Sequence, residues 1–265
     1  MLALLALVAN RVLSLFFLFI FGFVIERFRP VEPEIHEKGL ILNGLVGFCF
    51  IFADELALMA LSFALLYSWD GLFSSATDGG SIEKSWALLL AWLVARDFFY
   101  YWFHRLQHGW KWLWPQHALH HSEEHVNITT SVRHHWLEMP LTAIFVYVPL
   151  NFIFPPPTIT FPIVAFVLGL MFLINHMNFR FGLGPFNWLF ATPQIHRIHH
   201  SRLEQHIDKN FAAMFPIWDV IFGTYYRPAA AEYPPTGLSS GERVTGAKQA
   251  LLLPFSMWRK MLSSK

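Results

Sequence analysis

The sequence predicts an all-α integral membrane protein of about four to five transmembrane or deeply inserted helices, with a cytosolic helical cap that carries a histidine-rich site for two metal ions. Three observations predict this fold class. Of the 265 residues, 55% are hydrophobic and only 14% are charged, whereas a soluble domain carries about 25% charged residues. The apolar residues form long runs, and the histidines gather in three short clusters beside those runs.

The first apolar runs are long enough to cross a bilayer, which takes about 20 apolar residues in a helix. Residues 1–25 contain Arg11, so this run is either a span with a snorkelling arginine, which we favour, or a segment in the interface. It lacks the basic region of a signal peptide, so we expect a retained anchor. Residues 40–67 cross with tilt. Residues 85–103 form another span, and it ends in aromatic residues typical of a membrane boundary.

Two further apolar runs, 139–154 and 158–175, are separated by three prolines, Pro155 to Pro157, at which a helix cannot continue. They predict a hairpin that enters the bilayer deeply. The polar sections before and after this hairpin therefore lie on one side of the membrane. We expect a single domain over residues 1–265, with anchor helices within 1–67 and a core at about 90–226.

The charged residues predict the orientation of the chain. Basic residues accompany the histidine clusters, whereas the opposite loop, 68–84, is acidic. By the positive-inside rule, the histidine side is cytoplasmic, at the bacterial inner membrane or at the endoplasmic reticulum in a eukaryote. Asp54 and Glu55 lie inside an apolar run, either as a buried pair with Arg96, which we favour, or as a proton path.

The histidine clusters have the spacing of metal ligands on helices. His104 and His108 form an HxxxH motif, and an HxxHH motif occurs twice, at His117, His120 and His121 and at His196, His199 and His200. Residues three and four apart share a helix face, and neutral imidazole is the commonest metal-binding side chain. These eight histidines exceed the needs of one zinc ion, so we predict a centre with two metal ions. Imidazole alone suits zinc, copper, iron and nickel alike.

Other residues near the clusters are predicted to support them. His176 ends the hairpin and is expected to be a ninth ligand. Asp97, His135, Asp208 and Asn210 are expected to orient imidazole N–H groups, with Glu138 holding His135. For the acids and Asn210, helix capping or turn formation is the alternative. His125, His134 and His206 are expected at the surface.

Composition also excludes some functions. The formal charge of +1 provides no basic stripe, so we expect no nucleic-acid partner. The single cysteine, Cys49, excludes a disulfide framework and a CxxC site.

The motifs HRLQH, HALHH and HRIHH, in this order and separated by a hairpin, resemble the membrane fatty acid hydroxylase/sterol desaturase superfamily. The stretches 122–130, 208–210 and 218–224 are similar to its branch of alkylglycerol monooxygenase and bacterial sterol-desaturase-like proteins. This resemblance covers residues 90 to 226 approximately and implies a di-iron, O₂-dependent enzyme that hydroxylates or desaturates lipids. Its ligands would be the eight motif histidines and His176.

The resemblance also implies partners. The substrate would be an apolar lipid of sterol, fatty acyl, alkyl-ether or carotenoid type. The sequence contains no cytochrome b5 domain, so we expect electrons from a separate protein of ferredoxin or cytochrome b5 type. Alkylglycerol monooxygenases use tetrahydrobiopterin, and no feature of this sequence identifies a pterin pocket.

Two other functions stay open. One is a metal-binding or metal-transporting membrane protein; transport would favour ligands spread through the depth of the membrane, whereas these histidines are gathered on one side. A zinc-dependent lipid hydrolase would need neither O₂ nor a reductant.

Overall fold

The computed structural model describes residues 16–28, 30–33, 37–68, 82–153 and 161–263, and over these residues the fold is helical. A helix over residues 16–28 precedes the two longest helices, α2 (Glu37–Ser68) and α3 (Ile82–Gly109). The shorter elements are α4 (Trp114–His121), η1 (Ile128–Val132), α5 (Glu138–Thr142), η2 (Ala143–Tyr147), α6 (Val148–Ile153), α7 (Phe161–Asn175), η3 (Gly184–Phe186), α8 (Pro193–His199), η4 (Glu204–His206), α9 (Ile217–Ile221) and α10 (Ala247–Ser263). Among the described residues, the only β-pairing is an isolated bridge between Ser201 and Thr236. The predicted helical class is confirmed over this part.

The apolar runs correspond to helices. Within α2, the segment Gly39–Ala57 has a mean hydropathy of 1.8 and is the one described helix that is long and apolar enough to cross a membrane. The hairpin limbs appear as a continuous helix, Glu138–Ile153, and as α7, and both are shorter than a usual span. The three prolines between them and residues 1–15 lie outside the described residues, so the hairpin tip and the first span stay predictions.

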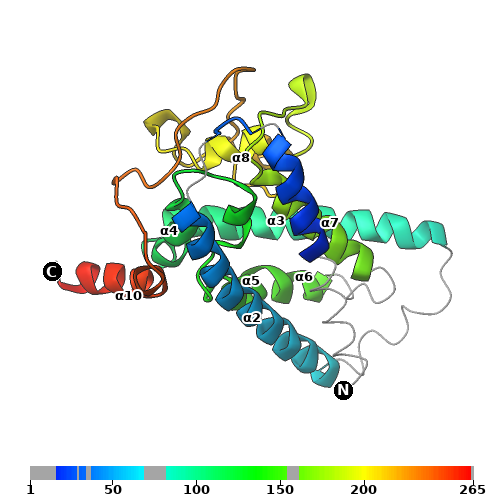
Figure 1. Ribbon diagram of the computed structural model, residues 1–265. Coiled ribbons are helices and arrows are strands. Elements are labelled where there is room, and N and C mark those ends of the chain that lie inside the picture. The colour runs from blue at the N-terminus through cyan, green and yellow to red at the C-terminus, as the bar shows by residue number, and fades with distance from the viewer. Residues whose placement is uncertain (1–15, 29, 34–36, 69–81, 154–160, 264–265) are drawn as a thin grey trace.

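The helices meet around α3 and α4, as Figure 1 shows. α3 contacts α4, α6 and α9, while α7 contacts α8, and α10 packs on α2 and α4. Ala118 and Leu119 of α4 are completely buried in a core shared with Leu42 of α2 and Leu253 of α10. This packing fixes one face of α4 and turns its histidines toward α3 and α8.

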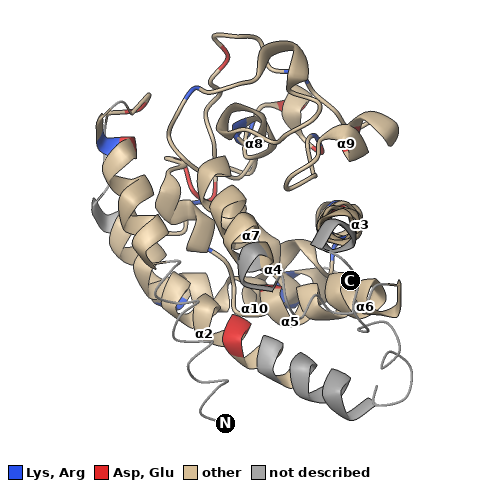
Figure 2. Cartoon of the chain, turned by 90° about the vertical axis from the view of Figure 1, so that its right-hand side faces the viewer, with Lys and Arg blue, Asp and Glu red and all other residues tan. Residues whose placement is uncertain are grey.

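Charged residues are sparse along α2, α6 and α7 and more frequent in the loops around α8 and α9 (Figure 2). Asp54 of α2 is buried, and its pairing with Arg96 stays a prediction. The guanidinium carbon of Arg96 lies 4.6 Å from the centre of the Tyr100 ring.

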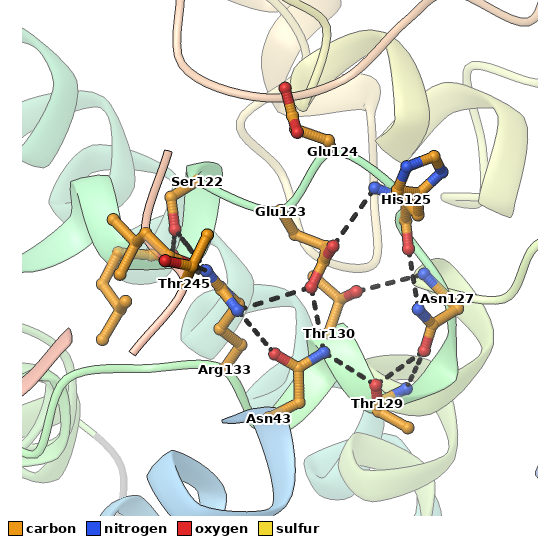
Figure 3. A network of polar contacts seen from close by, with 12 residues as sticks. Asn43, Ser122, Glu123, Glu124, His125, Asn127, Thr129, Thr130, Arg133 and Thr245 are labelled. Atoms are coloured by element: carbon orange, nitrogen blue, oxygen red, sulfur yellow. Dashed lines mark hydrogen bonds and ion pairs between the residues drawn. The ribbon is translucent and has the colours of Figure 1, made fainter. Parts of the chain in front are cut away.

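A buried polar network joins the segment after α4 to α2 (Figure 3). The Arg133 side chain is 2% exposed and donates hydrogen bonds to Asn43 Oδ1 at 2.8 Å, Ser122 Oγ at 2.8 Å and Val244 O at 2.9 Å. Asn43 Nδ2 donates to Glu123 at 3.0 Å, and this carboxylate lies 3.5 Å from Arg133. A buried charge needs such partners, so the network holds the second histidine motif at a fixed position relative to α2.

Candidate metal centre

The nine histidines predicted as ligands converge into two buried groups. The first group consists of His104, His108, His117, His121 and His199, and the second of His120, His176, His196 and His200. In each group, one ring nitrogen from every histidine lies within 4.8 Å of those from all the others. The structure thus brings together residues from α3, α4, the end of α7 and α8.

Each HxxHH motif serves both groups. On α4, His117 and His121 belong to the first group and His120 to the second. At α8 the assignment is reversed, because His196 and His200 belong to the second group and His199 to the first. In an α-helix, positions i and i+4 are nearly in line and position i+3 points to the other side of that line. The spacing therefore lets two facing helices line two adjacent sites.

The distances between ring nitrogens fit ligands of a common ion. The Nε2–Nε2 distances are 3.0 Å for His104–His117, 3.2 Å for His108–His121, 3.1 Å for His120–His176, 2.9 Å for His176–His196 and 3.1 Å for His196–His200. Two nitrogens bound to one ion at about 2.1 Å are about 3.0 Å apart in octahedral and about 3.4 Å apart in tetrahedral geometry.

Backbone carbonyls fix which nitrogen faces the group. His104 Nδ1 donates to Phe211 O at 2.7 Å, His176 Nδ1 to Phe172 O at 2.7 Å and His199 Nδ1 to Lys209 O at 2.9 Å. A carbonyl oxygen only accepts, so in a neutral ring each Nδ1 carries the proton and each Nε2 presents a lone pair. The Nε2 atom of His199 is buried and has no hydrogen-bond partner among the described residues. His104 and His199 belong to the same group, so two lone pairs point into it, and such lone pairs repel unless a cation lies between them; this donor set therefore fits a metal ion.

Burial keeps these rings neutral. It lowers the pKa of His117, His120 and His200 well below 6.5, and the neighbouring imidazoles lower it further. Neutral imidazole is the form that binds a metal ion, so the groups are ready to bind near pH 7.

One loop, residues 208–211, provides three acceptors for the first group and is called the acceptor loop below. Asp208 Oδ1 lies 3.4 Å from His108 Nδ1, and the loop also contains the carbonyl groups that bind His199 and His104. Asp208 and Asn210 both have φ of 58°, in the left-handed region that these short polar residues tolerate best after glycine. The predicted contact of Asp208 with a histidine is present in the structure, where its carboxylate faces His108.

The acceptor loop is held by buried polar side chains. Asn210 donates to Ile195 O at 3.3 Å and Tyr226 O at 3.0 Å. Asp219 accepts from the backbone N–H groups of Phe211 at 2.7 Å and Ala212 at 2.9 Å. These contacts fix the backbone whose carbonyls orient the imidazoles.

Three expected roles differ in the structure. Asp97 accepts from the N–H groups of Met214 and Phe215 at 3.0 and 2.8 Å, so it anchors the backbone beyond the acceptor loop, and within the described part of the chain it binds no imidazole. The contacts of the Asn210 side chain with the described residues are to backbone groups, so it supports the loop indirectly. His135 lies outside both groups, with Nε2 3.0 Å from Leu251 O, and among the described residues its hydrogen bond with Glu138 joins backbone atoms, Glu138 N–H to His135 O at 2.9 Å.

Glu138 instead approaches the first group. Its Oε2 lies 3.5 Å from His117 Nδ1, and its Oε1 accepts from Gln107 Nε2 at 2.8 Å. Burial raises the pKa of Glu138 to about 7, against the opposing effect of the Gln107 hydrogen bond. The spacing from His135 pointed to the wrong partner, because residues 133–137 are not helical and one-turn spacing does not apply there.

Two histidines expected at the surface are buried. His134 is 3% exposed and its ring stacks on His120, with centroids 3.9 Å apart. His206 is completely buried, with Nδ1 2.9 Å from Ser201 Oγ and Nε2 3.0 Å from Glu232. His125 keeps a side chain that is 33% exposed. Adjacent polar residues in irregular segments give no periodic signal that separates inside from outside.

Several known proteins are similar to this chain in sequence. Human alkylglycerol monooxygenase is 38% identical over 162 residues, which cover 60% of this chain and 34% of the relative. The Caenorhabditis elegans alkylglycerol monooxygenase is 30% identical over 218 residues, covering 78% and 41%. Ornithine lipid hydroxylase OlsE of Rhizobium tropici is 30% identical over 164 residues, covering 62% and 49%. The chain thus spans less than half the length of these relatives, and no solved structure matches it.

The family model for fatty acid hydroxylase matches residues 89–224, just over half of the chain. This match begins in α3 and includes every histidine of both groups together with the acceptor loop. The resemblance seen in the three motifs is confirmed, and the chain belongs to the fatty acid hydroxylase family.

Proposed function

We propose that this chain is an O₂-dependent di-iron enzyme that hydroxylates or desaturates an apolar lipid at the membrane. The observation that supports it best is the pair of imidazole groups, with Nε2 atoms 2.9 to 3.2 Å apart, inside the segment that matches the family. The names of the relatives describe lipid-modifying monooxygenases and hydroxylases, which supports a lipid substrate.

The five histidines of the first group would hold one iron ion and the four of the second group the other. Bound iron would supply the activation of O₂ for oxidation of a C–H bond. In hydroxylation one oxygen atom enters the substrate and the other leaves as water, using two protons and two electrons. A separate electron-transfer protein of ferredoxin or cytochrome b5 type would deliver the electrons.

The residues of the chain would position the rings and exclude water. The carbonyl groups of the acceptor loop keep the Nε2 atoms directed inward, and complete burial of His104 and His117 by α3 and α4 keeps solvent away. Exposed Phe48, Phe52 and Phe152 on α2 and α6 would face lipid. A lipid chain would then reach the site from the bilayer, with the site on the cytoplasmic side.

His120→Ala tests this function. We expect the variant to lose metal, measured as metal per chain by mass spectrometry, and to lose the oxidised lipid that lipidomics detects in cells with the intact gene. His125→Ala, outside both groups, is the matched control and should keep both. Unchanged metal content and unchanged lipid oxidation in His120→Ala would contradict the proposal.

The reaction conditions separate the proposed oxygenase from a zinc-dependent lipid hydrolase. Product formation that requires O₂ and a reductant supports the oxygenase. Turnover of a lipid with zinc alone, without O₂ or reductant, would indicate a zinc-dependent hydrolase instead.

A further inference from the structure

His134 has an unusual environment for a histidine. It lies just before α5, is 3% exposed, and stacks on the His120 ring with an interplanar angle of 17°. Phe50 of α2 also stacks on it, at 4.9 Å between centroids. Neither ring nitrogen has a hydrogen-bond partner among the described residues.

A phenylalanine would provide the same stacking without the polar atoms. Burying a polar atom without a hydrogen bond costs about 1–3 kcal/mol. An imidazole at this position is therefore better explained by a ligand for its nitrogens than by packing alone.

Two polar side chains lie beside it. One ring nitrogen of His134, one of His117 and a carboxylate oxygen of Glu138 are all within 4.8 Å of one another, and all three residues are buried. Because His117 Nε2 faces His104, the nitrogen of His117 that faces Glu138 is Nδ1. Three polar atoms at this spacing can each lie about 2.8 Å from one central water molecule, and a buried water typically makes about three hydrogen bonds.

We propose that His117, His134 and Glu138 enclose a binding site for one buried water molecule, which makes His134 a positioning residue for both histidine groups. The water donates one hydrogen to the Glu138 carboxylate and the other to a nitrogen of His134, and its oxygen accepts from the His117 N–H. Through this water His134 steadies His117 of the first group, and through its ring it steadies His120 of the second. The inference rests on the metal sites of the proposed function.

Water fits the site better than a third metal ion. His117 Nε2 already belongs to the first group, so an ion bound through Nδ1 would require an imidazole that has lost both protons. Donation from Nδ1–H to the water and to Glu138 keeps the tautomer that leaves Nε2 free to bind metal.

A pair of variants separates the polar role from stacking. His134→Phe keeps the stack on His120 and removes both nitrogens, whereas His134→Ala removes both features. We expect metal release to a chelator to become about tenfold faster in His134→Phe, and faster still in His134→Ala. If His134→Phe releases metal as slowly as the original protein, stacking alone explains His134 and the proposal is wrong.

A double-variant cycle tests the shared water. Because one molecule contacts both residues, the effects of His134→Phe and Glu138→Gln on metal release should be non-additive, whereas independent effects would contradict the site. An experimental structure gives a direct reading even if a variant fails to fold. A density peak about 3 Å from His134 and Glu138 without anomalous signal supports the water. An anomalous metal peak there, or no peak, overturns it. These readings are independent of lipid oxidation, so they separate this inference from the outcome of His120→Ala.

Discussion

Nδ1 of His104 donates a hydrogen bond to the carbonyl oxygen of Phe211, 107 residues later in the chain, at 2.7 Å. This bond ties the first histidine group to the acceptor loop, because the same loop also binds His108 and His199. The orientation of three imidazoles therefore depends on how firmly this loop is held. The residues that hold this loop can be substituted without changing any histidine.

Asp219→Ala should release the acceptor loop. The variant leaves the buried N–H groups of Phe211 and Ala212 without their acceptor, at about 1–3 kcal/mol for each group. We expect a lower melting temperature and less metal per chain after purification. Glu204→Ala, at an exposed position, is the control and should change neither. Normal metal content in Asp219→Ala would show that the imidazoles keep their orientation without the loop.

Asp208→Asn should act more weakly. The Asp208 side chain is 61% exposed, its carboxylate lies 3.4 Å from His108 Nδ1, and Asn tolerates the same left-handed backbone. Asn keeps an oxygen acceptor for His108 but loses the negative charge that strengthens this hydrogen bond, for which we expect up to about a tenfold lower metal affinity and an unchanged melting temperature. Affinity is measured by competition with a chelator. An effect as large as that of Asp219→Ala would mean that Asp208 also supports the loop itself.

The two histidine groups were predictable from the sequence, whereas of the side chains expected to support them only Asp208 contacts a ring, for a physical reason. HxxxH and HxxHH lie on helices, where spacing alone fixes which side chains share a face. The acceptors for His104 and His199 are backbone carbonyl groups. Every residue has one, so the amino-acid sequence does not indicate which residues provide these acceptors. Asp97 lies on the same helical stripe as His104, but its carboxylate binds the backbone at Met214 and Phe215.

For the helices too, the sequence predicts where each one lies along the chain but not how they are placed relative to one another. Long apolar runs predicted α2, α3 and the two limbs of the hairpin, because hydrophobic runs of this length form helices near a membrane. The short α8 begins at Pro193. The residue before it, Thr192, caps the helix by accepting a hydrogen bond from Ile195 N–H. Its histidines were predictable from spacing, but its position across from α4 depends on distant contacts that a local pattern does not contain.

Two glycines of α2 provide a matched pair of variants. A Cβ atom at Gly47 would lie 2.7 Å from Val132 Cγ2 and 2.9 Å from Val132 Cβ, whereas at Gly44 it would meet nothing within 4 Å. Gly47→Ala should therefore force α2 away from η1 and lower stability by about 1–3 kcal/mol. Gly44→Ala should be neutral or stabilise the helix by up to about 1 kcal/mol. Thermal unfolding in detergent compares the two; equal melting temperatures would show that α2 and η1 do not pack this closely.

Glu26 predicts a pH dependence of stability. Its Oε2 accepts from the backbone N–H groups of Ile128 at 2.9 Å and Asn178 at 3.0 Å, and burial raises its pKa from 4.5 to about 6. A raised pKa means that the folded chain binds this proton more tightly than the unfolded chain. The stabilisation is complete below pH 4.5 and is lost as the pH rises through about 6.

Glu26→Gln keeps an oxygen acceptor for both N–H groups and cannot ionise. The melting temperature of this variant relative to the original protein should therefore rise between pH 5 and pH 7 and then level off. The corresponding difference in the free energy of unfolding changes by at most about 2 kcal/mol. Melting curves at pH 5, 6, 7 and 8 measure the difference, and Glu242→Gln at an exposed position controls for the loss of a surface charge. Parallel curves for the Glu26 variant and the original protein would show that this carboxyl binds protons equally in the folded and unfolded states over the whole range, so that its burial does not raise its pKa.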